Sequence, residues 1–101
     1  MAQFVRFGLD PAYYNIDKIV HWGVYKQMSV HENSEVYVIT MQTDTPINSN
    51  GFEGYFDITC ELGHYANKEE ALSAVIHAIE MPGTVGVVPH KERNGDTPSH
   101  D

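Results

Sequence analysis

The sequence has little of what would tie a protein to a membrane or to an oxidising compartment. It contains one cysteine, Cys60, so no disulfide can form within the chain. It has no uninterrupted apolar run of about 18 residues, the length needed to span a bilayer. Residues 1–10 lack the charged start and long apolar segment of a secretory signal. We therefore expect a cytoplasmic protein that does not bind membranes.

Positive charge is also scarce. Six lysine and arginine residues stand against 14 aspartate and glutamate residues, which gives a formal net charge of −8. Residues 27–67 contain no lysine or arginine, and their acidic residues are Glu32, Glu35, Asp44, Glu53, Asp57 and Glu61. This distribution disfavours direct binding to nucleic acid, because phosphates attract lysine and arginine. The acidic span either serves solubility alone or faces a basic protein partner.

Length and composition fit one folded domain with a core. The chain has 101 residues, of which 42% are hydrophobic. We expect a single domain over residues 1–90. Residues 91–101, KERNGDTPSHD, are polar and include a glycine and a proline, so we expect them to form a flexible tail.

Four segments have the alternation or the β-branched composition of strands. They are residues 2–9, 35–43, 54–63 and 84–90, and the second is apolar on both faces, as expected of a central strand. Residues 31–34, HENS, are expected to form the hairpin turn before it. In the third segment the expected inward residues are Phe56, Ile58, Cys60 and Leu62, and the outward ones are Tyr55, Asp57, Thr59 and Glu61.

Residues 10–22 are ambiguous between helix and strand. Asp10 can cap a helix, Pro11 suits its first position and Gly23 can end it. Residues 18–30, however, also alternate in the manner of a strand. We favour a short helix over 11–22, followed by a strand from Gly23.

The clearest helix signal in the sequence lies in residues 67–80. Asn67 and Glu70 have the spacing of a capping box. His77 is expected on the solvent side, among neighbouring carboxylates. The helical period predicts a core stripe made of Leu72, Val75, Ile76 and Ile79.

A second stripe on this helix consists of Ala71, Ala74 and Ala78. Alanine favours helix at exposed positions, which is one explanation. The other is that small side chains let a second helix approach closely, either from residues 11–22 or from another copy of the chain. Together the segments predict an α+β fold: a small antiparallel sheet of four to five strands with one or two helices packed on one face, with a ferredoxin-like arrangement as the first choice.

Catalytic motifs are missing from the chain. It has no nucleophile elbow, no phosphate-binding glycine loop and no H-E-x-x-H motif. Cys60 and His64 would lie about 13 Å apart on an extended segment, so we expect Cys60 to be a buried core thiol. His77 and Glu80 have the spacing of a metal-binding pair, but two ligands are too few for a structural site. We expect no catalysis, no cofactor and no metal ion.

No motif identifies a family. In size and charge the chain resembles the small acidic proteins with which phages and mobile elements block nucleic-acid-binding machines. That resemblance implies a non-catalytic protein that occupies a basic surface of a partner protein. Phe52, in the long connection 43–54, either anchors such a partner or caps the core. The expected contact residues are Glu32, Glu35, Phe52, Glu53, Tyr55, Asp57 and Glu61.

A second hypothesis is a small-ligand-binding domain or minor enzyme. Its pocket would lie near His64, Tyr65 and His77, between the subunits of a homodimer. The absence of clustered catalytic residues favours the interaction protein.

Overall fold

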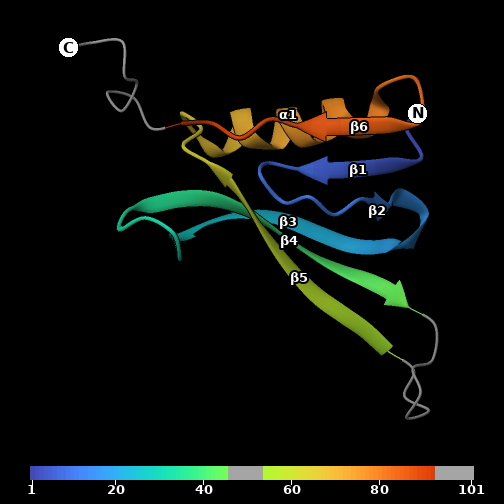
Figure 1. The fold of residues 1–101 in the computed structure, drawn as a ribbon, viewed down its shortest axis with the longest axis horizontal. Coiled ribbons are helices and arrows are strands. Elements are labelled where there is room, and N and C mark those ends of the chain that lie inside the picture. The colour runs from blue at the N-terminus through green and yellow to red at the C-terminus, as the bar shows by residue number, and fades with distance from the viewer. Residues whose placement is uncertain (46–53, 93–101) are drawn as a thin grey trace.

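The strands of this protein divide between two small sheets. The computed structural model describes residues 1–45 and 54–92, which form an α+β fold of six strands and one helix (Figure 1). In chain order the elements are β1 (Phe4–Phe7), β2 (Tyr14–Asn15), a 3-10 turn η1 (Ile16–Lys18), β3 (Ile19–Met28), β4 (Glu35–Thr45), β5 (Gly54–Gly63), α1 (Lys68–Glu80) and β6 (Val85–Val88). The first sheet has the order β2-β1-β6 and the second β3-β4-β5.

The first sheet is mixed, with β1 at its centre. β1 pairs antiparallel with β2 and parallel with β6. Its alternation is as expected, because Val5 and Phe7 are fully buried while Phe4 and Arg6 are half-buried. In β6 the register partners of Val5 and Phe7 are Gly86 and Val88, both buried, so one face of this sheet belongs to the core.

The second sheet is an antiparallel meander with β4 in the middle. Val36 and Val38 on one face of β4 and Ile39 and Met41 on the other are all 0–1% exposed, which confirms the predicted central strand. Residues 29–34 connect β3 to β4, so the predicted hairpin turn is also confirmed.

The described part of β5 follows its predicted alternation. Cys60 and Leu62 are buried, whereas Asp57 and Thr59 are exposed. The register to β4 shifts between Tyr37 and Val38, a bulge at the C-terminal end of β5. β5 is an edge strand of its sheet, which leaves its outer side next to the loops described below.

The predicted helix over residues 11–22 is wrong. This segment is extended: it forms β2, one 3-10 turn and the start of β3, which begins at Ile19 and not at Gly23. β-branched residues favour strands, and pairing with β1 and β4 outweighs the capping signal. The carboxylate of Asp10 does accept a hydrogen bond from a nearby backbone N–H, that of Ala12, but in a turn and not at a helix start.

The predicted helix over residues 67–80 is confirmed. Its N-cap is Asn67, whose side-chain oxygen accepts a hydrogen bond from the Glu70 N–H at 2.8 Å. His77 and Glu80 are exposed, as expected. Among the described residues, no helix is long and apolar enough to cross a membrane.

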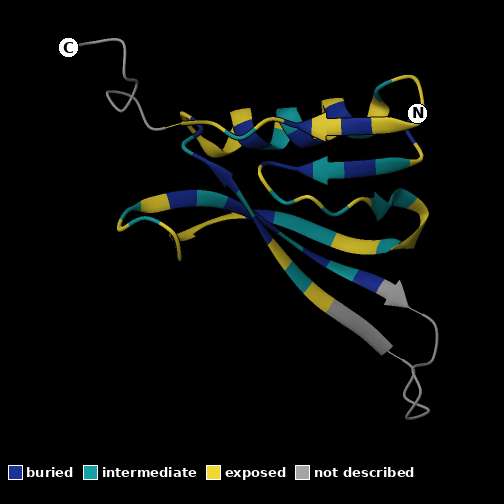
Figure 2. Ribbon diagram, viewed as in Figure 1, coloured by how far each residue is buried: buried dark blue, intermediate teal, exposed yellow. Residues whose placement is uncertain are grey.

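The predicted core stripe of α1 is confirmed only in part. Val75 is buried in the core and Leu72 and Ile79 pack against it, but the helix is turned toward its alanine side, which leaves Ile76 exposed. Ala71, Val75 and Ala78 are fully buried, Ile76 is 44% exposed, and Leu72 and Ile79 are half-buried (Figure 2). The reason is a very close approach to β6: a Cβ placed on Gly86 would lie 1.9 Å from the Ala78 carbonyl oxygen. Only small side chains fit between backbones at that distance. The side of α1 that carries Ala71 and Ala78 is thus covered within the same chain. It does not form a surface for a second helix or for a second copy of the protein.

The arrangement of the sheets also differs from expectation. A ferredoxin-like fold needs one four-stranded sheet under two helices, whereas the described residues have two three-stranded sheets and a single helix. The core lies between them and joins side chains of β1, β3, β4, β5, α1 and β6. The chain after β6 is tied to β5, since the Lys91 N–H donates to the Leu62 carbonyl and the His64 N–H donates to the Lys91 carbonyl.

Candidate functional site

One cavity, of about 730 Å³, is lined by residues of β5, by Gln27 of β3 and by three loops. The loops are the turn after β1, the hairpin between β3 and β4, and the segment after β6. The lining includes carboxylates and imidazoles but, among the described residues, no lysine or arginine. We call it the acidic cavity, and its lining residues are Leu9, Asp10, Pro11, Gln27, Val30, His31, Glu32, Thr59, Cys60, Glu61, His90 and Glu92.

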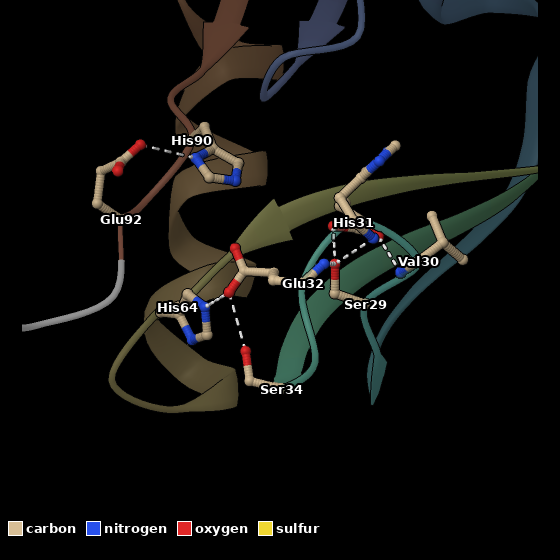
Figure 3. Close-up of polar contacts among 9 residues, drawn as sticks. Ser29, Val30, His31, Glu32, Ser34, His64, His90 and Glu92 are labelled. Atoms are coloured by element: carbon tan, nitrogen blue, oxygen red, sulfur yellow. Dashed lines mark hydrogen bonds and ion pairs between the residues drawn. The ribbon is translucent and has the colours of Figure 1, made fainter. Parts of the chain in front are cut away.

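Glu61 fixes the hairpin wall of the acidic cavity. Its carboxylate accepts hydrogen bonds from the Ser29 hydroxyl at 2.8 Å and from the Val30 N–H at 3.0 Å. The same hydroxyl oxygen accepts the N–H groups of His31 and Glu32, which closes the turn (Figure 3). A carboxylate on β5 therefore determines the conformation of a loop more than 30 positions earlier in the chain.

A histidine from the segment after β5 supports the same hairpin. His64 Nε2 lies 2.7 Å from Glu32 Oε1, and the Ser34 hydroxyl donates to that oxygen at 2.9 Å (Figure 3). The His64 side chain is only 14% exposed, so it is committed to this contact. This position explains why His64 is not available to the pocket that the second hypothesis placed beside it.

A buried thiol and a hydroxyl share one carboxylate at the floor of the acidic cavity. Cys60 Sγ donates to Asp10 Oδ2 at 3.1 Å, and the Tyr14 hydroxyl donates to the same oxygen at 3.0 Å. Burial alone would raise the pKa of Asp10, but the hydrogen bonds from Ala12, Cys60 and Tyr14, with the nearby Arg6 charge, lower that pKa overall. Asp10 is therefore ionised at neutral pH.

The pKa values of the two side chains that donate hydrogen bonds to Asp10 shift in the opposite direction. Burial, reinforced by the hydrogen bond to the Asp10 carboxylate, raises the pKa of the Cys60 thiol to about 12. Burial, followed by the influence of Cys60 and Asp10, also raises the pKa of Tyr14 above its ordinary value. Both groups are neutral donors, and Cys60 is the buried core thiol expected from the sequence.

Cys60 is expected to resist alkylation in the folded protein. With a pKa of about 12, roughly one thiol in ten thousand is a thiolate at pH 8, and the thiolate is the reactive form. Iodoacetamide should thus modify the native protein far more slowly than the denatured chain, as followed by mass spectrometry. Asp10→Asn removes a carboxylate that raises the thiol pKa, so it should speed the native reaction. Rapid modification of the native wild-type protein would contradict this arrangement.

His90 and Glu92 form the third side of the acidic cavity. His90 Nδ1 is buried and, among the described residues, has no hydrogen-bond partner. A Glu92 carboxylate oxygen lies 3.6 Å away, too far for a hydrogen bond but close enough for an ion pair (Figure 3). The Glu92 side chain is 73% exposed, while that of His90 is 14% exposed.

The predicted contact residues do not form one continuous surface. Glu32 and Glu61 meet at the acidic cavity, where both also have structural roles. Glu35 is exposed at the hairpin end of β4, in register with Met28, whereas exposed Asp57 lies in register with Gln42. Tyr55 lies in β5; Phe52 and Glu53 fall outside the described residues.

Sequence reasoning missed Asp10, His90 and Glu92 as neighbours of Glu61. Asp10 and Cys60 are 50 positions apart, and no spacing rule connects them. The one usable signal was that residues 10–12 follow the predicted strand 2–9 and residues 89–92 span the end of the predicted strand 84–90, because polar residues at strand ends commonly gather at one edge of a fold.

A smaller groove, of about 360 Å³, lies beside α1 and the residues that follow β6. Tyr65 and His77 both line it, as the second hypothesis expected, together with Glu70 and Lys91. The Tyr65 hydroxyl, however, donates to the Pro89 carbonyl at 2.6 Å. That bond gives Tyr65 a structural role, and His64 lies elsewhere on Glu32.

Comparison with known proteins gives no match: no family model fits the sequence, and no curated protein or solved structure is significantly similar to it. Within residues 1–45 and 54–92, no group of three or more His, Cys, Asp and Glu side chains is arranged to hold a metal ion. The chemistry of the acidic cavity must therefore be argued from its own residues.

Proposed function

We propose that the protein is a non-catalytic interaction protein that occupies a basic surface of a partner protein, such as the nucleic-acid-binding surface that phage-type inhibitors block. The observation that carries the proposal is the acidic cavity, in which the carboxylates of Asp10 and Glu61 are oriented by the protein itself. The span 27–67 without lysine or arginine supports it further.

The donors that hold Asp10 and Glu61 are neutral. They are two backbone N–H groups, two hydroxyls and one thiol. Such donors fix the direction of a carboxylate but leave its negative charge in place. A partner with complementary positive charge would meet a preorganised surface, which lowers the ordering cost of binding and speeds encounter.

The state of the potential nucleophile supports the non-catalytic part of the proposal. Cys60 is buried, and Asp10 stabilises its thiol form, which is the reverse of the activation that a nucleophilic cysteine needs. The alternative of a small-ligand domain rests on the groove beside α1, where Tyr65 already bonds to Pro89.

Reversing two exposed charges, one on the lining of the acidic cavity and one further along β5, is expected to reduce the capture of basic partners strongly. Asp57 lies on the same strand face as Glu61, and Glu92 lines the cavity; both are exposed, so Asp57→Lys with Glu92→Lys should leave the fold intact. Immobilised wild-type protein should retain basic proteins from a cell lysate at low salt. The double variant should retain at least about tenfold less of the same proteins, since association depends on complementary charge.

The matched control reverses two exposed acids at the far end of the molecule. Asp17 in η1 and Glu80 in α1 lie beside the N-terminal residues, away from the cavity, and their replacement by lysine changes net charge by the same amount. The control variant should still retain the basic proteins. Retention should weaken as salt screens the charges. Added DNA or RNA should displace the retained proteins if the contact is a nucleic-acid-binding surface. Equal loss with both double variants, or retention of acidic proteins only, would overturn the proposal.

A further inference from the structure

We propose that two copies of this chain pair through the free edge of β6, as antiparallel strands about a two-fold axis. β6 ends its sheet, since its only strand partner among the described residues is β1 (Figure 1). The pairing joins two three-stranded sheets into one sheet of six strands. This inference is independent of the acidic cavity and goes beyond the proposed function.

The outward backbone groups of β6 belong to Val85 and Val87. In a parallel pair of strands, alternate residues of each strand bond to the neighbour. The Val88 carbonyl oxygen accepts the Gly8 N–H at 2.8 Å, so it is Gly86 and Val88 that face β1. The N–H and C=O groups of Val85 and Val87 therefore point away from the sheet. Within residues 1–45 and 54–92, no other strand and no side chain bonds to them.

β6 is the least protected of the four edge strands in the described residues. Exposed edges usually carry a charged side chain, a bulge or a proline, which prevents pairing with another chain. β3 has Lys26 and a bulge near its start, β5 has Asp57 and Glu61, and β2 has only two residues. The four residues of β6 are VGVV, without charge or bulge, and its exposed and buried residues alternate (Figure 2). Val85 and Val87 are 36% and 37% exposed.

A two-fold axis at Gly86 satisfies every outward backbone group of both copies. In an antiparallel pair, every second pair of opposite residues exchanges both N–H···O=C bonds. With Gly86 opposite itself, Val85 of one copy faces Val87 of the other, and the two symmetric pairs form about four hydrogen bonds. The valine side chains then lie opposite each other on the outer face, as an apolar cross-strand pair that stabilises the sheet. A second copy of the chain thus complements this edge without any further segment.

The flank of α1 beside this edge also suits a second copy, and it differs from the buried side of the helix. The smaller groove, of about 360 Å³, is lined by Val87 of the edge and by Ser73 and Ala74, whose short side chains let a second helix approach. Its lysine and its glutamate, Lys91 and Glu70, have opposite charges. Two copies of a chain with a net charge of −8 can therefore meet here without opposing only carboxylates.

The expected dimer is weak, because the strand edge is short. A stable interface usually buries about 800 Å² on each partner, more than a four-residue edge supplies by itself. The groove beside α1 must therefore contribute to the contact. We expect a concentration-dependent association with a dissociation constant of roughly 1–100 µM.

Light scattering coupled to size-exclusion chromatography tests the pairing on the full chain. From about 1 µM to about 1 mM, the mean mass should rise from that of the 11.4 kDa chain toward twice that value. Hydrogen exchange then locates the contact. The amides of Val85 and Val87 should exchange rapidly in the dilute protein and at least about tenfold more slowly in the dimer. The amides of Gly86 and Val88, which bond to β1, should be protected in both states and serve as the internal control.

A matched pair of variants separates this edge from surface charge in general. Val87→Lys places a charge on the free edge and should weaken dimerisation at least about tenfold, although it reduces the net negative charge of the chain. Val20→Lys makes the same change on β3, where Val20 is 52% exposed, and should leave dimerisation within about twofold. Thermal unfolding checks that both variants are folded. Val85→Lys supplies a second edge variant in case Val87→Lys does not fold.

Any of four results would overturn the inference. A mass of 11.4 kDa over the whole concentration range would mean that two copies do not pair. A dimer in which the Val85 and Val87 amides exchange rapidly would use another surface, and so would one that both lysine variants weaken equally. Slow exchange of these amides in the monomer would mean that the edge is covered within the chain. Because these measurements involve neither the acidic cavity nor a lysate protein, the proposed function is tested separately.

Discussion

Replacing Gly86 with alanine is expected to destabilise the protein by about 3 kcal/mol or more. A Cβ at this position would lie 1.9 Å from the carbonyl oxygen and 2.7 Å from the carbonyl carbon of Ala78, both backbone atoms of α1. The backbone of a helix cannot move aside as a flexible side chain can, so β6 and α1 would have to separate. At about 4–8 °C per kcal/mol for a domain of this size, the midpoint of thermal unfolding should fall by more than about 12 °C.

Gly23→Ala provides the control for this prediction, because it adds the same methyl group to another strand. The new Cβ would meet the ring of Tyr25, whose hydroxyl oxygen would lie 2.6 Å away. That ring is 52% exposed and can rotate into solvent. Alanine is also favoured over glycine in a strand by restricting the unfolded chain. Gly23→Ala should therefore change stability by less than about 1 kcal/mol. Equal effects of the two substitutions in urea unfolding would show that α1 does not contact β6 as described.

Strand faces were predictable from the sequence because alternation has a period of two. In β4, Val36, Val38, Ile39 and Met41 are buried, and of the inward residues predicted for β5, Cys60 and Leu62 are buried while Ile58 is half-buried and packs against the core. A shift by one residue would exchange the two faces, so the pattern leaves few alternatives. The cap of α1 was equally predictable, since Asn67 bonds to an N–H three residues later in the same segment.

Two features could not be predicted from local sequence. The face of α1 depends on Gly86, which lies after the helix, and the apolar pattern alone favoured the larger residues Leu72 and Ile76. The extended form of residues 10–22 depends on pairing with β1 and β4, because local signals supported a helix. To predict either feature, one must know which strand or helix packs against the segment. The residues within the segment itself do not carry that information.

The candidate site was only partly predictable for the same reason. The acidic span identified Glu32 and Glu61, but their shared cavity includes Asp10 and His90 from the two ends of the described chain. The acidic span also gave no sign that the Glu61 carboxylate accepts hydrogen bonds from Ser29 and Val30 and so fixes the hairpin between β3 and β4. Charge reversal at Glu61 would therefore disturb the loop as well as the charge, which is why Asp57 and Glu92 are better positions for testing recognition.

The second large effect is expected from Ala78→Leu, which should cost about 3 kcal/mol or more. Ala78 is fully buried, and its backbone faces Gly86 at close range, so no space exists for a longer side chain. Ile76→Ala is the companion substitution on the neighbouring face, where the side chain is 44% exposed. It should cost less than about 1 kcal/mol, because little buried apolar area is lost and alanine favours helix.

The two substitutions distinguish the observed helix face from the one that the sequence pattern favoured. If Leu72 and Ile76 formed the core stripe, Ile76→Ala would cost about 2–5 kcal/mol and Ala78→Leu would be nearly neutral. Urea unfolding of both variants, followed by far-ultraviolet circular dichroism, shows directly which substitution lowers the free energy of unfolding more. A larger loss for Ile76→Ala than for Ala78→Leu would mean that α1 is rotated about its axis. The close contact with β6 would then be lost as well, so Gly86→Ala should become tolerable in the same protein.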